Sequence, residues 1–145
     1  MGFNMRWLIA ILALAGMVAA ILALREHYRT EASPCSINEK WDCGTVNKSR
    51  FAVIKGVPVA DIGIAGYLLL AGLAFGRRWR LLAVAAVPAW VFSLYLAHIE
   101  KDILEVWCIY CVISLGMITA ITVLSLIALG MDWRRSRQAR AESTA

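Results

Sequence analysis

Four stretches of the chain contain no Asp, Glu, Lys or Arg, and this pattern limits the possible folds more than any other feature. They are residues 7–24, 62–75, 81–97 and 106–130. A helix that crosses a bilayer needs about 20 predominantly apolar residues, so each stretch is a candidate transmembrane helix. The second is short, and we extend it back to Val57, which puts Pro58 in the first turn, where its missing N–H costs little. The expected spans are 7–25, 57–76, 80–98 and 105–130.

The sequence therefore predicts an all-α integral membrane protein, with a bundle of four transmembrane helices in a single domain, 1–145. Hydrophobic residues make up 61% of the chain, above the roughly 45–50% of soluble proteins. Residues 26–56 are expected to form an outer loop, and 131–145 a basic tail. A cleaved signal peptide is the alternative for the first span, but its apolar run is longer than the usual signal core.

The distribution of basic residues predicts that both termini face the cytoplasm. Dense Lys and Arg in short flanking segments mark the cytoplasmic side of a membrane protein. The side with the termini carries eight basic residues: Arg6, Arg77, Arg78, Arg80, Arg134, Arg135, Arg137 and Arg140. The basic tail is then a topology signal or a contact with anionic membrane lipids, and no nucleic-acid partner is expected.

The four cysteines form two pairs on the predicted outer side, where disulfides persist. Cys35 and Cys43 lie in the loop 26–56, and Cys108 and Cys111 lie at the outer end of the fourth span. Two structural disulfides are the simpler alternative to a redox role. No metal site is expected, because one pair with seven intervening residues and one intramembrane pair give poor ligand geometry for zinc.

The expected start of the fourth helix decides how Cys108 is placed. Asp102 can cap a helix that begins there, with Glu105 three residues later in a pattern like a capping box. Cys108 and Cys111 would then stand on one helical face, and Cys108 would lie in the second turn. Since the dipole effect fades within the first turn, we expect no strongly depressed thiol pKa on that ground.

Several motifs occur in a fixed order along the chain. They are the loop pair Cys35 and Cys43, the stretch Trp-Asp-Cys-Gly-Thr-Val-Asn-Lys-Ser-Arg-Phe at 41–51, Gly-Val-Pro at 56–58, residues 63–67, and Cys-Ile-Tyr-Cys at 108–111. This ordered set resembles the vitamin K epoxide reductase family. The resemblance implies reacting cysteines inside a four-helix bundle, capped by the outer loop and by a short interfacial helix, here residues 47–55.

The resemblance also implies roles for particular residues. Cys111 would react with a quinone, Cys108 would pair transiently with Cys43, and Cys35 would face a protein partner. The candidate quinone contacts are Ser49, Phe51, Val59, Trp107, Tyr110 and Leu115. Val59 and Leu115 stand where vertebrate members hold the quinone with an asparagine and a tyrosine, which favours simple quinone reduction over epoxide reduction.

The expected function is a membrane thiol-disulfide oxidoreductase that reoxidises a separate thioredoxin-like (DsbA-like) protein and passes two electrons to a lipid quinone. The quinone would be of the ubiquinone, menaquinone or vitamin K type. One alternative is a vitamin K quinone or epoxide reductase that uses protein thiols as reductant, and another is a non-enzymatic four-helix scaffold. The expected location is a bacterial inner membrane, with the endoplasmic reticulum membrane as the alternative. His98 is expected to be solvated, and a role as proton donor to the quinone is the bolder interpretation.

Overall fold

The computed structural model describes residues 2–145, and most of them are helical. In chain order the elements are α1 (Gly2–Tyr28), α2 (Cys43–Lys48), the 3-10 turn η1 (Arg50–Ala52), β1 (Val53–Ile54), β2 (Val57–Pro58), α3 (Val59–Phe75), α4 (Trp79–Ile99), the π-helical turn η2 (Glu100–Leu104) and α5 (Ile109–Thr144). The predicted all-α fold with four principal helices is confirmed.

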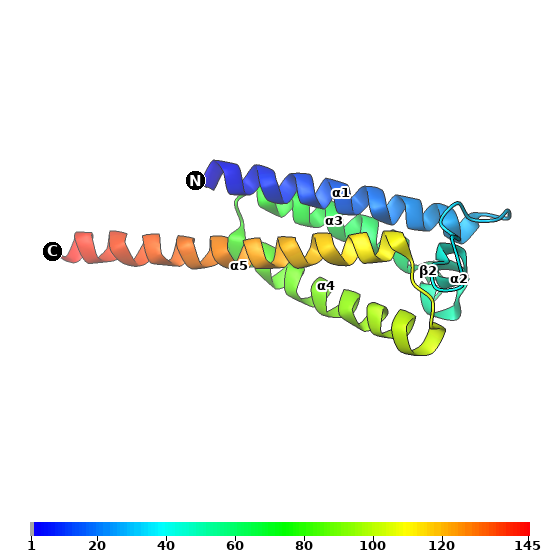
Figure 1. The fold of residues 1–145 in the computed structure, drawn as a ribbon. Helices are drawn as coiled ribbons and strands as arrows, with labels where there is room; N and C mark the ends of the chain where they lie inside the picture. Colours follow the sequence, from blue (N-terminus) through cyan, green and yellow to red (C-terminus); the bar gives the residue numbers. More distant parts are fainter. Residues whose placement is uncertain (1) are drawn as a thin grey trace.

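The four principal helices pack into one bundle. Helix α1 packs against α3 and α5, and α5 also packs against α4. Figure 1 shows both termini at the same end of this bundle, while α2 and the short strands lie at the other end. Gly16 of α1 faces Tyr67 of α3, and a Cβ atom at Gly16 would overlap the tyrosine ring. The two helices therefore approach closely because position 16 has no side chain.

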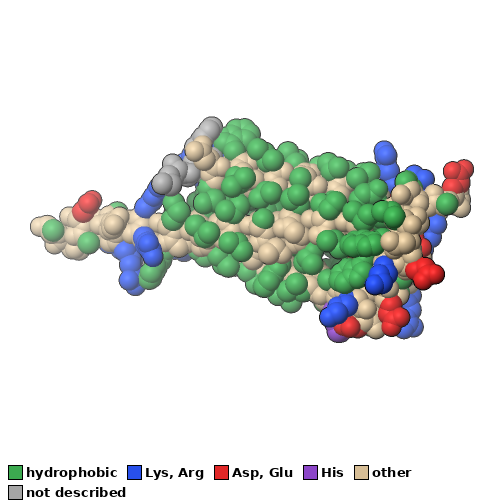
Figure 2. Space-filling model, viewed as in Figure 1, with side chains coloured by type: hydrophobic (Ala, Val, Ile, Leu, Met, Phe, Trp, Pro, Cys, Tyr) green, Lys and Arg blue, Asp and Glu red, His purple; other side chains and the backbone are tan. Residues whose placement is uncertain are grey.

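The surface of the bundle is apolar enough for a bilayer. Three helical segments, Asn4–Tyr28, Trp79–Leu104 and Ile109–Thr144, are long and apolar enough to cross a membrane, and Val59–Phe75 is a shorter apolar helix. Figure 2 shows hydrophobic side chains along the length of the bundle, with charged side chains gathered toward its two ends. Large side chains such as Val84 and Ile11 are exposed there, as lipid-facing residues would be. The chain is a multi-pass membrane protein.

The predicted short helix at 47–55 is wrong, because this part of the outer segment is built differently. Helix α2 begins earlier, at Cys43, because Asp42 caps it by accepting hydrogen bonds from the backbone N–H and the hydroxyl of Thr45, at 3.2 and 2.8 Å. Residues 53–58 instead form a hairpin of two short antiparallel strands. Its turn needs a positive φ of 85° at Gly56, a conformation in which glycine costs little.

The fourth principal helix also begins later than predicted, at Ile109 rather than near Asp102. Asp102 does not cap it, because its carboxylate pairs with His98 at 2.7 Å. Instead, α4 continues through the π-helical turn η2, and Glu105 then reverses the chain with a φ of 56°. The first position before α5 is therefore occupied by Cys108, which serves as its N-cap. At its other end α5 runs through residues 131–144, so the basic tail is helical.

Candidate active site: a cysteine cluster beside an apolar cavity

All four cysteines gather at the outer end of the bundle. Cys35 and Cys43 form a disulfide with Cα atoms 5.5 Å apart, whereas Cys108 and Cys111 are free thiols. Cys35, Cys43 and Cys108 belong to one buried cluster, and Cys111 packs against it. Cys43 and Cys108 are fully buried, while 5% of Cys35 is exposed. The loop pair, Cys35 and Cys43, thus packs against Cys108 and Cys111, and Cys35 is slightly more exposed to solvent than Cys43.

A backbone bridge attaches the loop to the segment before α5. The N–H of Asp42 donates to the carbonyl of Trp107 at 3.0 Å, and the N–H of Trp107 donates to the carbonyl of Lys40 at 2.7 Å. The rings of Trp41 and Trp107 lie 6.4 Å apart between centroids. Since Cys43 follows Asp42 and Cys108 follows Trp107, this bridge aligns the two cysteines.

Cys108 receives hydrogen bonds on its sulfur. The backbone N–H of Cys111 and the side-chain N–H of Asn47 each approach the sulfur to 3.4 Å. A hydrogen bond from the Cys111 thiol, followed by these two donors, lowers the pKa of the Cys108 thiol despite its burial and the nearby Glu100. The sequence led us to expect no strongly depressed pKa from the helix dipole, because we placed the helix start near Asp102; the helix begins at Ile109, so that premise is wrong.

Asn47 is a site residue that the sequence analysis missed. Its side chain is buried and also donates to the Cys43 carbonyl at 2.8 Å. The same amide group therefore contacts one cysteine of each pair. The sequence signal was slight: Asn47 stands four residues after Cys43, which puts both on one face of a helix once the Asp42 cap is recognised.

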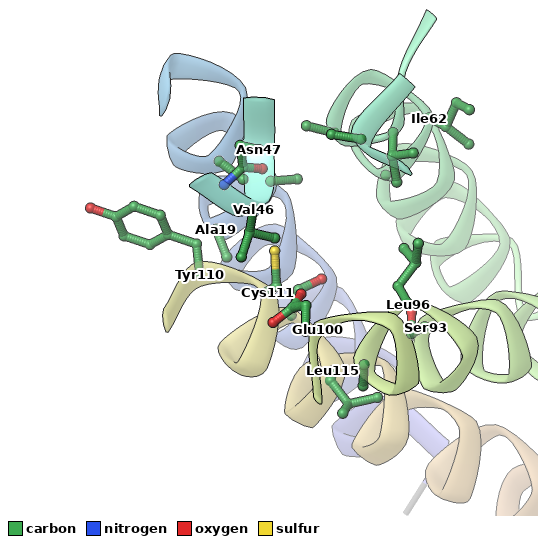
Figure 3. Close-up of a pocket in the computed structure, with 18 of the residues that line it drawn as sticks. Ala19, Val46, Asn47, Ile62, Ser93, Leu96, Glu100, Tyr110, Cys111 and Leu115 are labelled. Carbon is green, nitrogen blue, oxygen red and sulfur yellow. The ribbon is translucent and has the colours of Figure 1, made fainter. Parts of the chain in front are cut away.

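A cavity of about 260 Å³ opens beside the cysteine cluster, with a mainly apolar lining. Its walls come from α1, α3, α4, α5 and the segment that follows Cys43, as Figure 3 shows in part. The lining includes Cys111 together with all six candidate quinone contacts: Ser49, Phe51, Val59, Trp107, Tyr110 and Leu115. The structure brings these residues together around one space, and their contact with a quinone stays a prediction.

Glu100 is the second site residue that the sequence analysis missed. Its side chain is buried, and only 4% of it is exposed. Its carboxylate accepts a hydrogen bond from the Cys108 N–H at 3.1 Å and interacts with the Cys111 thiol. Figure 3 shows Glu100 and Cys111 next to each other in the cavity. The π-helical turn places Glu100 here, and π turns often occur at functional sites.

His98 does not take part in this arrangement. Its side chain is 65% exposed and pairs with Asp102. The cavity lining contains neither of these residues, within the part of the chain that the structure describes. The polar side chains that line the cavity include Glu100, His27, Asn47 and Tyr67, whose hydroxyl is hydrogen-bonded to Ser114 at 2.7 Å.

The site can move electrons between two thiol pairs and a ligand in the cavity. A free dithiol lies against a disulfide, and one of its thiols lines the mainly apolar cavity. Residues 7–126 match the model of the vitamin K epoxide reductase family. That match covers most of the chain, so the chain belongs to this family and is a disulfide oxidoreductase. Members of the family typically use a quinone.

Proposed function

We propose that this member of the vitamin K epoxide reductase family reoxidises a separate thioredoxin-like protein and passes two electrons to a lipid quinone. The observation that carries the proposal is the position of Cys111, which packs against the buried cysteine cluster and lines the apolar cavity. A residue that touches both the disulfide system and a lipid-compatible pocket is suited to the last transfer.

The relay begins at the loop pair. A thiolate of the reduced partner attacks the sulfur of Cys35 and releases Cys43 as a thiolate, and the second partner thiol then frees Cys35. Cys35 is the natural point of attack because it is the more exposed member of its pair. After this step the partner holds a disulfide, and the loop pair holds the two electrons.

The next exchange takes place between the two pairs of the chain itself. Cys43 attacks Cys108 in the oxidised Cys108–Cys111 pair and releases Cys111. Cys35 then attacks Cys43, which restores the loop disulfide and frees Cys108. The hydrogen bonds that Cys108 accepts from Cys111 and Asn47 make it a good leaving group in this step. The bonding state of the structure, a loop disulfide beside two free thiols, is the state that follows this exchange.

The last step transfers two electrons and two protons from Cys108 and Cys111 to the quinone, giving a disulfide and a hydroquinone. A benzoquinone or naphthoquinone ring suits a cavity of about 260 Å³, and the isoprenoid tail would extend into lipid. Val59 and Leu115 offer the ring no hydrogen bonds. This favours quinone reduction over epoxide reduction. The proposed setting is a bacterial inner membrane with cytoplasmic termini and an outward-facing cysteine cluster.

Anaerobic quinone reduction tests the proposal. The purified protein in nanodiscs is mixed with a reduced thioredoxin-like protein and a short-chain ubiquinone or menaquinone, and hydroquinone formation is followed by absorbance. We expect turnover with the native chain and none with Cys111→Ala or Cys43→Ala. Turnover that persists in Cys111→Ala would contradict the relay. Turnover with vitamin K epoxide but with no quinone would favour the epoxide reductase alternative.

A further inference from the structure

We propose that Glu100 is the proton-transfer residue of quinone reduction, taking the proton of the Cys111 thiol and delivering it to the quinone oxygen beside it. This inference rests on the proposed function and adds a residue to its last step. It replaces His98, which the sequence suggested as a proton donor and which lies exposed, with its ring nitrogen against the Asp102 carboxylate.

The geometry around Glu100 carries the inference. The carboxyl group lines the same cavity as Cys111 and interacts with its thiol. The carboxyl group is also fixed in position, because one of its oxygens accepts a hydrogen bond from the Cys108 N–H at 3.1 Å. Glu100 therefore touches both reacting cysteines and the space that the quinone would occupy, as Figure 3 shows for Cys111.

The charge environment of Glu100 sets it apart from Glu26, the other buried carboxylate among the residues whose burial the structure describes. Among residues 2–145, the ion pairs formed by carboxylates are Arg29 with Glu26 and His98 with Asp102, and no basic side chain pairs with Glu100. Buried carboxylates are usually paired with a cation, since an isolated buried charge is costly. A buried, unpaired carboxyl group beside two thiols is a candidate for proton exchange rather than for a structural ion pair.

The chemistry balances with Glu100 unchanged at the end. Cys111 gives its proton to Glu100 and its electron pair to the quinone ring. Cys108 then attacks the Cys111 sulfur, which forms the disulfide and leaves both electrons on the quinone. Glu100 protonates the nearer quinone oxygen, and the second oxygen takes a proton from water, which receives the proton of Cys108. The net change is two thiols and one quinone converted to one disulfide and one hydroquinone.

A purely structural role is the competing explanation, because Glu100 also holds the Cys108 N–H. Glu100→Gln separates the two roles: the amide oxygen can still accept that N–H, whereas the amide group cannot carry the proton. Glu105→Gln is the matched control, since Glu105 is an exposed acid five residues away. Each variant is reconstituted as the full chain in nanodiscs.

Two steps are measured separately in each variant. The first is the rate at which a reduced thioredoxin-like protein reduces the loop disulfide, and the second is the single-turnover rate at which the reduced Cys108 and Cys111 pair reduces decyl-ubiquinone. In Glu100→Gln we expect the quinone step to slow about 100-fold or more, as for loss of a general acid or base. The loop step should stay within about twofold, and Glu105→Gln should match the native chain in both steps.

Chemical rescue provides an independent readout. Glu100→Ala leaves space in the cavity for a small acid, so added formate should accelerate its quinone step and leave Glu100→Gln unchanged. Native rates in Glu100→Gln would overturn the proposal, and so would equal slowing of both steps without rescue by formate, the signature of a structural role. Failure of the proposed function would look different, because the native chain itself would then not reduce decyl-ubiquinone.

Discussion

Replacing Asn47 by leucine removes the side-chain N–H that reaches the Cys108 sulfur, while it keeps a side chain of similar size in the buried space. The amide donates to Cys108 at 3.4 Å and to the Cys43 carbonyl at 2.8 Å. Because this donor is one of the groups that lower the pKa of the Cys108 thiol, its loss should raise that pKa. The thiolate of Cys108 would then be less populated at any pH below the new value.

The size of the effect follows from the geometry. A hydrogen bond to a charged group contributes about 1.5–3 kcal/mol, and an N–H···S contact of this length belongs at the lower limit. About 1.4 kcal/mol corresponds to one pKa unit, or a tenfold change in thiolate fraction. Because the substitution raises the pKa of Cys108, the Cys108 thiol of Asn47→Leu should react about tenfold more slowly at pH values below the pKa of both the native and the variant thiol. Above both pKa values the two chains should react equally fast.

Alkylation by iodoacetamide across a pH series measures this change when the variant is compared with the native chain, in which Cys108 is equally buried. The loop disulfide is kept intact, and the labelling of Cys108 is read from its peptide by mass spectrometry. Ser49→Ala is the control, because Ser49 bonds the Val46 carbonyl at the end of the same helix and does not touch Cys108. An unchanged pH–rate profile in Asn47→Leu, or a profile moved to lower pH, would refute the assigned role of Asn47.

Two further substitutions test the packing and the loop. Gly16→Ala should lower the thermal unfolding midpoint, because the new methyl group overlaps the Tyr67 ring and overpacking costs about 1–3 kcal/mol, whereas Gly66→Ala, with open space at its Cβ position, should not. Asp42→Ala should weaken the α2 cap by about 1 kcal/mol and speed proteolysis of the loop. Hydrogen bonds from Ser36 and then Thr45 lower the pKa of Asp42, so its stabilisation is present above the ordinary carboxyl pKa. That stabilisation is lost as the pH falls through the lowered value, and an acid-insensitive proteolysis rate would contradict this.

The sequence predicted the bundle well because membrane spans leave a strong signal. Runs without charge identify helices by length alone, and all four helices appear in the structure, although α5 continues from the predicted end at 130 to Thr144. The resemblance to the family predicted the six candidate quinone contacts, and all six line one cavity. Their recognition depended on ordered motifs rather than on any single residue, since a lone Cys-Ile-Tyr-Cys is weak as a signal.

Local turns were harder to predict, and they decide the chemistry of the site. Asp102 followed by Glu105 has the spacing of a capping box, but in the structure Asp102 pairs with His98, and the chain reverses at Glu105. Because α5 begins at Ile109, Cys108 is its N-cap residue. The same π-helical turn places Glu100 in the lining of the cavity. Charge alone could not indicate this, because burial depends on how one irregular turn is packed.

The most direct test of the account is the covalent link between the two cysteine pairs. In a Cys111→Ala chain, Cys108 can attack Cys43 of the loop disulfide and release Cys35, which is the reverse of the last exchange, and alkylation of the freed Cys35 thiol then traps the link. Non-reducing digestion and mass spectrometry should then find a Cys43–Cys108 disulfide, and a chain that also carries Cys43→Ala should lack it. A link between Cys35 and Cys108 instead would contradict the order of the relay, and the absence of any link between the pairs would contradict the relay itself.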